Sequence, residues 1–225
     1  TRENLRDAAD LRVRPSISAG QLTVLVQTVN RTGHKLPTGY PSRRVWVNLS
    51  VADRYGERVF ESGAFDPATG EIVGLDFPTE PHRQTIRAQD ETIVYEAEAG
   101  DASGEYTVSL VRADRLIKDN RILPEGYDPT RLAAFGLQEF DLNRVGVGVD
   151  PEFLPGADQV RYEIELGESP GPYRLTTRLY YQAVKPRHLD GMRSERSAEE
   201  QDFLSRFPRH SAPELMVEDV QLVSR

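Results

Sequence analysis

The four histidines are the side chains of this sequence best suited to chemistry, because imidazole is a ligand for haem iron, zinc and copper. No two of them have the i, i+4 spacing of a helical zinc motif, and the chain has no cysteine to supply thiolates. His34 and His82 lie in stretches rich in glycine or proline, which predicts loops. Each is therefore either a loop residue that hydrogen-bonds the backbone or a group that approaches a haem. His188 and His210 are expected at the surface.

Carboxylates and nucleophiles give weaker signals. Aspartates recur near predicted turns, where a calcium site is conceivable, but none has EF-hand spacing and local capping of turns explains them better. The chain has no G-x-S-x-G, no H-E-x-x-H and no P-loop. We therefore expect a protein that is not an enzyme and that has no metal site of its own.

His34 belongs to a long connection, residues 30–42, that carries or adjoins several cationic side chains. Arginine forks suit carboxylates, including haem propionates, so the sequence predicts a partner-binding surface here. Its predicted members are Lys35, Tyr40, Arg43, Arg44, Trp46, Lys118 and Arg121. The alternative interpretation places these cations in internal salt bridges, for instance Arg44 with Asp119, and Trp46 in the core.

The elements that must position these residues are mainly strands. Val45, Val47, Leu49 and Val51 alternate with other residues, as in a strand with one buried face. Similar patterns predict the strands 22–29, 44–52, 57–61, 92–98, 106–112, 160–166, 175–183 and 215–223. This number of strands joined by turn-rich segments predicts an all-β fold, an antiparallel immunoglobulin-like β-sandwich with long loops and one short helix.

The predicted domain organisation is simple. Residues 1–20 are expected to form an N-terminal arm or short helix, and 21–225 a single sandwich domain. Loop insertions are expected at 65–89 and 118–158, which are rich in glycine and proline. Loops longer than roughly 12–15 residues are usually functional or disordered. A helix is predicted near 194–206, where Ser197 and Glu200 have capping-box spacing.

Composition limits the partners. The net charge of −8, from 28 basic and 36 acidic side chains, argues against nucleic acid binding. The same charge either keeps the domain soluble or steers a basic partner towards it. No apolar run approaches the roughly 20 residues of a membrane span, and without cysteine the chain forms no disulfide.

Several blocks of sequence resemble a known module, among them GHKLPTG at 33–39, PSRR at 41–44, EPH at 80–82, IVYE at 93–96 and LIKDNRILP at 116–124. Together they are similar to the C-terminal β-rich module of periplasmic multihaem c-type cytochromes. Those cytochromes attach haem through Cys-x-x-Cys-His, and a chain without cysteine cannot do so. Either the haem domain lies outside this chain, or this is a haem-free relative that serves a haem protein.

The resemblance implies a non-catalytic, periplasmic or extracytoplasmic accessory subunit. It would dock on a multihaem c-type cytochrome within a respiratory or photosynthetic membrane electron-transfer complex. No cofactor would be bound covalently, and His34 and His82 would lie close to a partner's haem. One alternative is that a histidine, His34 first, ligates the partner's iron. The other is a sandwich that binds a small ligand or carbohydrate through aromatic side chains at its loops, namely Tyr40, Tyr55, Tyr127 and Phe135.

Overall fold

Two antiparallel sheets face one another in the computed structural model, which describes residues 2–75, 79–136, 145–194, 197–206 and 212–224. The first sheet has the order β1-β2-β8-β5, in which the short β5 pairs parallel with β8. Its strands are β1 (Ala9–Ser18), β2 (Gln21–Asn30), β8 (Ala157–Glu165) and β5 (Thr85–Ile86).

The second sheet has the order β10-β9-β3-β6-β7, and β4 pairs with β3 beside this path. Its strands are β10 (Glu214–Val223), β9 (Tyr173–Gln182), β3 (Arg44–Ala52), β6 (Val94–Gly100), β7 (Arg115–Asp119) and β4 (Arg58–Ser62). Together the two sheets confirm the predicted all-β sandwich.

The core lies between the sheets because alternate residues of each strand point inward. Leu22, Val24 and Val26 of β2 are buried, and every second residue of β8 from Asp158 is buried in the same way. From the other sheet, β3 contributes its odd-numbered valines and Leu49. The even-numbered Trp46 packs in a second, smaller cluster on the opposite face of β3, against Val94 and other residues. The central strand β3 is therefore buried on both faces.

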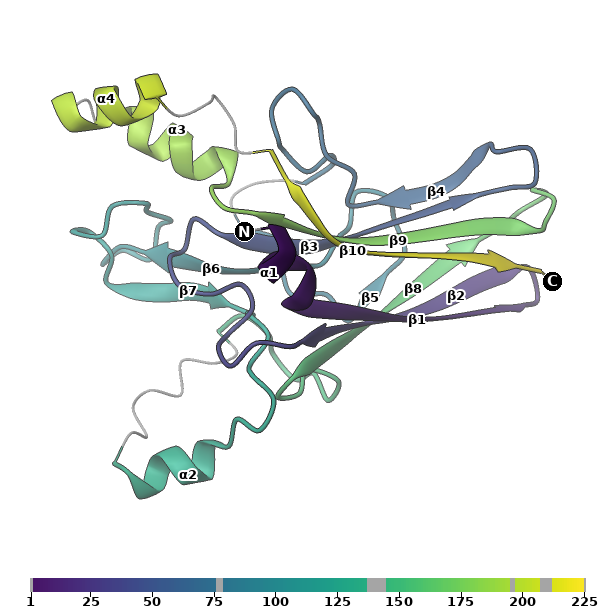
Figure 1. The fold of residues 1–225 in the computed structure, drawn as a ribbon, viewed down its shortest axis with the longest axis horizontal. Coiled ribbons are helices and arrows are strands. Elements are labelled where there is room, and N and C mark those ends of the chain that lie inside the picture. Colours follow the sequence, from purple (N-terminus) through teal and green to yellow (C-terminus); the bar gives the residue numbers. More distant parts are fainter. Residues whose placement is uncertain (1, 76–78, 137–144, 195–196, 207–211, 225) are drawn as a thin grey trace.

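The long connections gather at one end of the sandwich, which we call the loop end (Figure 1). It receives residues 31–43, 101–114, 120–156 and 183–213, whereas the opposite end has the short turns 19–20, 53–57 and 166–172. The helices α1 (Arg2–Asp7), α2 (Pro129–Ala134), α3 (Pro186–Ser194) and α4 (Ala198–Arg206) lie towards the loop end. No helix in the described part of the chain is both long and apolar enough to cross a membrane.

Some predicted elements differ from those of the structure. Residues 106–112 form no strand and contribute only the bridge of Tyr106 to Gly100, and the strand that follows β6 and pairs with its outer side is β7. Residues 1–20, predicted as an N-terminal arm or short helix, contain the short helix α1 and then β1, which was not predicted and pairs with β2 along its whole length. Pro15 is tolerated because β1 is the outer strand of its sheet. The helix predicted near 194–206 is present as α4, whereas α3, which precedes it, was not predicted.

Candidate functional site

The loop that carries His34 is fixed by one buried side chain, Asn30 at the end of β2. Its Nδ2 donates to the carbonyl oxygens of His34 at 2.7 Å and Ile122 at 3.0 Å, and its Oδ1 accepts from the backbone N–H of Thr32 at 2.9 Å. Leu36 and Ile122 exchange two backbone hydrogen bonds of 2.9 Å. The loop is therefore tied to residues 122–123 at its centre, and His34 has a defined position.

The ring of His34 is exposed, and its hydrogen bonds define its tautomer. Nδ1 lies 3.0 Å from the carbonyl oxygen of Lys35 and 3.1 Å from Oγ1 of Thr32. A carbonyl oxygen only accepts, so Nδ1 carries the proton. In the neutral ring, Nε2 then holds the lone pair, which is the form that binds a metal.

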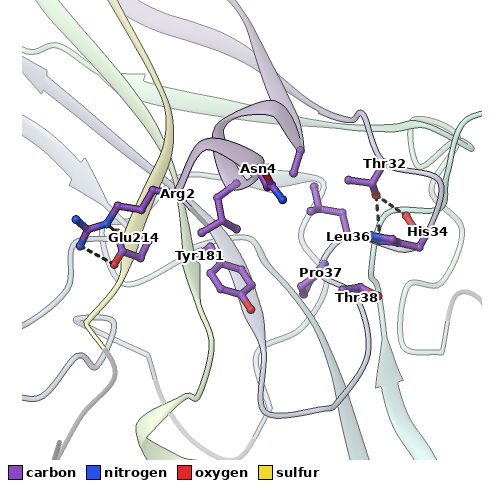
Figure 2. Close-up of a pocket in the computed structure, with 11 residues that line it drawn as sticks. Arg2, Asn4, Thr32, His34, Leu36, Pro37, Thr38, Tyr181 and Glu214 are labelled. Carbon is purple, nitrogen blue, oxygen red and sulfur yellow. Dashed lines mark hydrogen bonds and ion pairs between the residues drawn. The ribbon is translucent and has the colours of Figure 1, made fainter.

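His34 also lines an open pocket of about 580 Å³ at the loop end, shown in Figure 2. Its walls are mostly apolar, built by Leu5 and Ala8 near α1 and by Leu36 and Pro37 of the loop. The polar groups on its edge include His34, Thr38, Tyr181 and the Arg2–Glu214 ion pair, in which Nε and Oε2 are 2.9 Å apart. A pocket of this size and lining is typical of sites that bind small molecules or prosthetic groups.

The cationic side chains around this loop form ion pairs and hydrogen bonds within the protein. Lys35 Nζ and Arg121 Nε each lie 2.7 Å from the carboxylate of Asp119, a buried residue at the end of β7. Burial raises the pKa of Asp119, but the hydrogen bond and charge of Arg121, and then those of Lys35, lower it below its usual value. Arg121 also donates to the carbonyl of Gly39 at 3.1 Å, and Arg43 donates to that of Thr38 at 2.9 Å.

Three residues of the predicted partner-binding surface are inside the protein. Trp46, Lys118 and Arg44 are 0%, 2% and 5% exposed, so the structure removes them from that surface. The internal interpretation was right for Arg44 but named the wrong partner, because Arg44 donates to Gln182 at 2.7 Å and lies 3.7 Å from Glu71. Half-buried at the loop end remain Lys35, Tyr40, Arg43 and Arg121.

Lys118 belongs to a buried network of charges under the loop end. Glu96 of β6 lies between Lys118 and Lys185, each 2.9 Å from one of its oxygens, and Lys185 also reaches Glu98 at 2.6 Å. Burial raises the pKa of Glu96, but the two lysines outweigh it and the pKa is lowered. Burial and the neighbouring charge of Glu96 raise the pKa of Glu98 to about 7.

His82 lies elsewhere, in a second buried polar cluster, and its side chain is 0% exposed. Its Nε2 is 2.9 Å from Asp150 Oδ2 and 4.0 Å from Asp158 Oδ2, and its Nδ1 is 3.2 Å from Nδ2 of Asn120. Tyr95 donates to Asp158 at 2.8 Å. The side chain of His82 is therefore enclosed within the protein, which corrects the expectation that it lies close to a partner's haem.

A histidine with two aspartates within 4.8 Å is a possible metal centre. Asn120 argues against this, because its Oδ1 accepts from the N–H of Glu96 at 2.9 Å, which identifies Nδ2 as the donor to His82. Nδ1 of His82 is thus an acceptor, and Nε2 carries the proton that it donates to Asp150. A histidine bound to metal through Nε2 normally donates from Nδ1, which this amide prevents.

Asp158 is the least satisfied member of the cluster. Its Oδ1 has no hydrogen-bond partner among the described residues. Burial raises the pKa of Asp158 to about 7, the charge of Asp150 adds to this, and the hydrogen bond from Tyr95 opposes it. The cluster is a buried polar network in which the pKa of Asp158 is raised to about 7.

The remaining candidates are dispersed. His188 is buried at 2% exposure, not at the surface, and burial together with the charge of Lys185 lowers its pKa to about 4. His210 lies outside the described residues. The four aromatic residues considered for carbohydrate do not form one rim, since Tyr55 is in the turn at the opposite end.

Sequence reasoning missed Asp150, Asp158 and Asn120 as partners of His82. One signal was available in β8, where Asp158 has the same parity as Val160, Tyr162 and Ile164 and therefore points inward. A carboxylate at an inward position needs a partner in the core. Asp150 and Asn120 carry no such signal, because both follow or lie within irregular segments.

Comparisons with known proteins support a relation of fold. No family model matches the chain, and no curated protein matches it. Among solved structures, the penta-haem cytochrome c552 from Thermochromatium tepidum is similar, with a TM-score of 0.60 and 14% sequence identity. The similarity covers 99% of this chain and 41% of that chain, so this chain spans less than half the length of the cytochrome. At this identity the likeness shows a shared fold.

Proposed function

We propose that this β-sandwich is a non-catalytic, extracytoplasmic module that docks on the haem-carrying part of a multihaem c-type cytochrome. The observation that carries the proposal is the extent of the structural match. Nearly the whole chain, 99%, corresponds to 41% of a penta-haem cytochrome, as expected of one module within such a protein. Because this chain has no cysteine, it would contribute contacts and shielding of haem edges, and its partner would contribute the redox chemistry.

The loop end is the surface that suits this role best. It carries the blocks that resemble the cytochrome module, and it combines a defined loop with an open, largely apolar pocket. A haem edge is apolar and flat, and its burial against such walls is favourable by roughly 25 cal/mol per Å² of apolar surface. In the cytochromes that these blocks resemble, the β-rich module is C-terminal to the haem-carrying part. In this chain α1 contributes to the pocket lining.

Co-purification of the tagged chain from native membranes, followed by haem staining and identification of the retained proteins, tests the proposal. We expect a multihaem c-type cytochrome to be retained by the wild-type chain. Thr38→Asp, which places a charge at the pocket, should reduce retention, and Tyr55→Ala at the opposite end is the matched control. Retention of no c-type cytochrome, or equal retention by Thr38→Asp, would contradict docking through the loop end.

A second candidate, binding of a small ligand, is favoured by the same pocket volume. It predicts that the isolated chain takes up an apolar small molecule at this site without any partner. A panel of such molecules, screened by thermal shift with Thr38→Trp as the filled-pocket control, separates it from docking. A ligand that stabilises the wild-type chain but not Thr38→Trp would support this second function.

A further inference from the structure

His34 differs from the other histidines that the structure describes, because its ring alone is exposed. His82 and His188 are buried, and both ring nitrogens of His82 are engaged. Nδ1 of His34 is held by a carbonyl oxygen, which orients the ring and leaves the lone pair on Nε2. A hydrogen bond from the second ring nitrogen to a backbone carbonyl is the usual support of a histidine that ligates a metal.

The surroundings of His34 restrict the kind of metal it can serve. Within the described residues, the only group of three or more side chains spaced to hold an ion is the cluster at His82, so His34 belongs to no such group. A lone imidazole does not build a closed zinc site, which takes four protein ligands. It suits a metal whose other positions are filled by a separate framework, as the porphyrin fills four positions of haem iron.

From these observations we infer that His34 is an axial ligand, through Nε2, for a haem iron presented at the loop end by the partner. The inference rests on the proposed function, because the partner supplies the haem. The apolar pocket beside His34, with Leu36 and Pro37 on one wall and Leu5 on another, would cover the edge of the macrocycle. Ligation forms one bond from the lone pair of Nε2 to iron and displaces a weaker ligand, with no change of oxidation state.

The test uses a ferric haem c peptide that has one histidine ligand and one open axial position. Titration with the wild-type chain should convert its spectrum from high-spin to low-spin with saturation, seen in visible absorbance and electron paramagnetic resonance. His34→Ala should weaken this conversion at least tenfold. Thr38→Trp should weaken binding through the pocket, whereas Tyr55→Ala, and His210→Ala at the histidine that the structure does not describe, should leave it unchanged.

The outcomes separate ligation from docking. No saturable low-spin species with the wild-type chain, or an equal one with His34→Ala, overturns the ligation. If the cytochrome is still retained from membranes in that case, docking stands without ligation. If His34-dependent ligation is seen while no c-type cytochrome is retained, the ligation stands and the proposed docking fails.

Discussion

Asn120 donates an amide proton to Nδ1 of His82 across 3.2 Å, and this contact decides the tautomer of the buried histidine. The amide is itself oriented by β6, through the N–H of Glu96 at 2.9 Å and the carbonyl of Val94 at 2.8 Å. His34 is held in the opposite tautomer by the carbonyl of Lys35. The two histidines in the blocks that resemble the cytochrome module therefore suit different roles. Nε2 of His82 is an internal hydrogen-bond donor, whereas Nε2 of His34 is an acceptor or a metal ligand.

The first prediction concerns the proton on His82. We expect ¹⁵N resonances of His82 typical of a neutral ring protonated at Nε2, since Asn120 donates to the other nitrogen. Asn120→Asp replaces that donor by an acceptor, so the ring should gain a second proton and become an imidazolium. Histidine ¹⁵N spectra at neutral pH measure both states. Nδ1 protonated in the wild-type protein would contradict the assignment.

The same tautomer predicts the response to metal. Because Nε2 carries a proton and Nδ1 is occupied by Asn120, zinc or calcium should not bind between His82, Asp150 and Asp158. Adding either ion, or a chelator, should leave the melting temperature unchanged in wild type and in Asp158→Asn alike. An increase in melting temperature that Asp158→Asn abolishes would show that the cluster is a metal site.

Asp158 gives a prediction about pH. Its pKa is about 7 in the folded protein and roughly 3.9 when unfolded, so the folded state binds the proton more tightly. The contribution of Asp158 to the free energy of unfolding is therefore full below about pH 4 and is lost as the pH rises to about 7. As the pH rises from about 4 to about 7, the free energy of unfolding of Asp158→Asn should therefore increase relative to that of wild type, by about 2–4 kcal/mol.

Chemical denaturation of both proteins from pH 4 to 8 measures this difference. The comparison with wild type matters because His188, whose pKa is about 4, contributes a slope of the opposite sign between about pH 4 and 6.5. Asp114→Asn, at an exposed aspartate, is the matched control and should run parallel to wild type. A constant difference between Asp158→Asn and wild type would show that Asp158 is ionised throughout.

The buried charge network predicts a large effect of removing one member. Lys185→Ala leaves Glu96 and Glu98 together under the loop end without their shared cation, so it should cost about 3–5 kcal/mol. Arg178→Ala, which breaks the partly exposed pair with Glu218 at 2.6 Å, should cost at most about 1 kcal/mol. Urea unfolding at neutral pH compares the two. Equal losses of unfolding free energy in the two variants would mean that the buried ion pairs contribute no more to stability than the partly exposed one.

The sequence predicted the sandwich because inward and outward residues alternate in most strands, and burial of one face imposes that period of two. It missed β1, which contains Pro15, because an outer strand tolerates a missing N–H. At the site, the loop residue His34 was found by its local sequence. The partners of His82 come from segments about 40 to 80 residues away, and tertiary folding alone brings Asn120 and Asp150 to it.

The cationic residues show a second limit. Lys35, Arg44, Lys118 and Arg121 look alike in the sequence, yet Arg44 and Lys118 are buried and the other two are half-buried. Which lysine or arginine faces solvent depends on where the carboxylates lie, and the nearest carboxylate in space is often distant in the chain. Glu96 and Lys185, for example, are 89 residues apart. Charge alone therefore could not separate a binding surface from an internal network.

Two glycines provide the last prediction, on how the smaller hydrophobic cluster around Trp46 is packed. Gly63 has φ of +71°, and a Cβ there would lie 2.3 Å from the carbonyl oxygen of Val47. Gly56 has φ of +84° but has nothing within 4 Å of its Cβ position. Gly56→Ala should therefore cost about 1 kcal/mol for its backbone alone, whereas Gly63→Ala should cost roughly 2–5 kcal/mol because the strands must also move apart.

Trp46, the single tryptophan, donates to the carbonyl of Gly63 at 2.9 Å, so its fluorescence should change in Gly63→Ala and not in Gly56→Ala. Equal costs and an unchanged Trp46 signal would show that β3 and the segment after β4 are not in close contact.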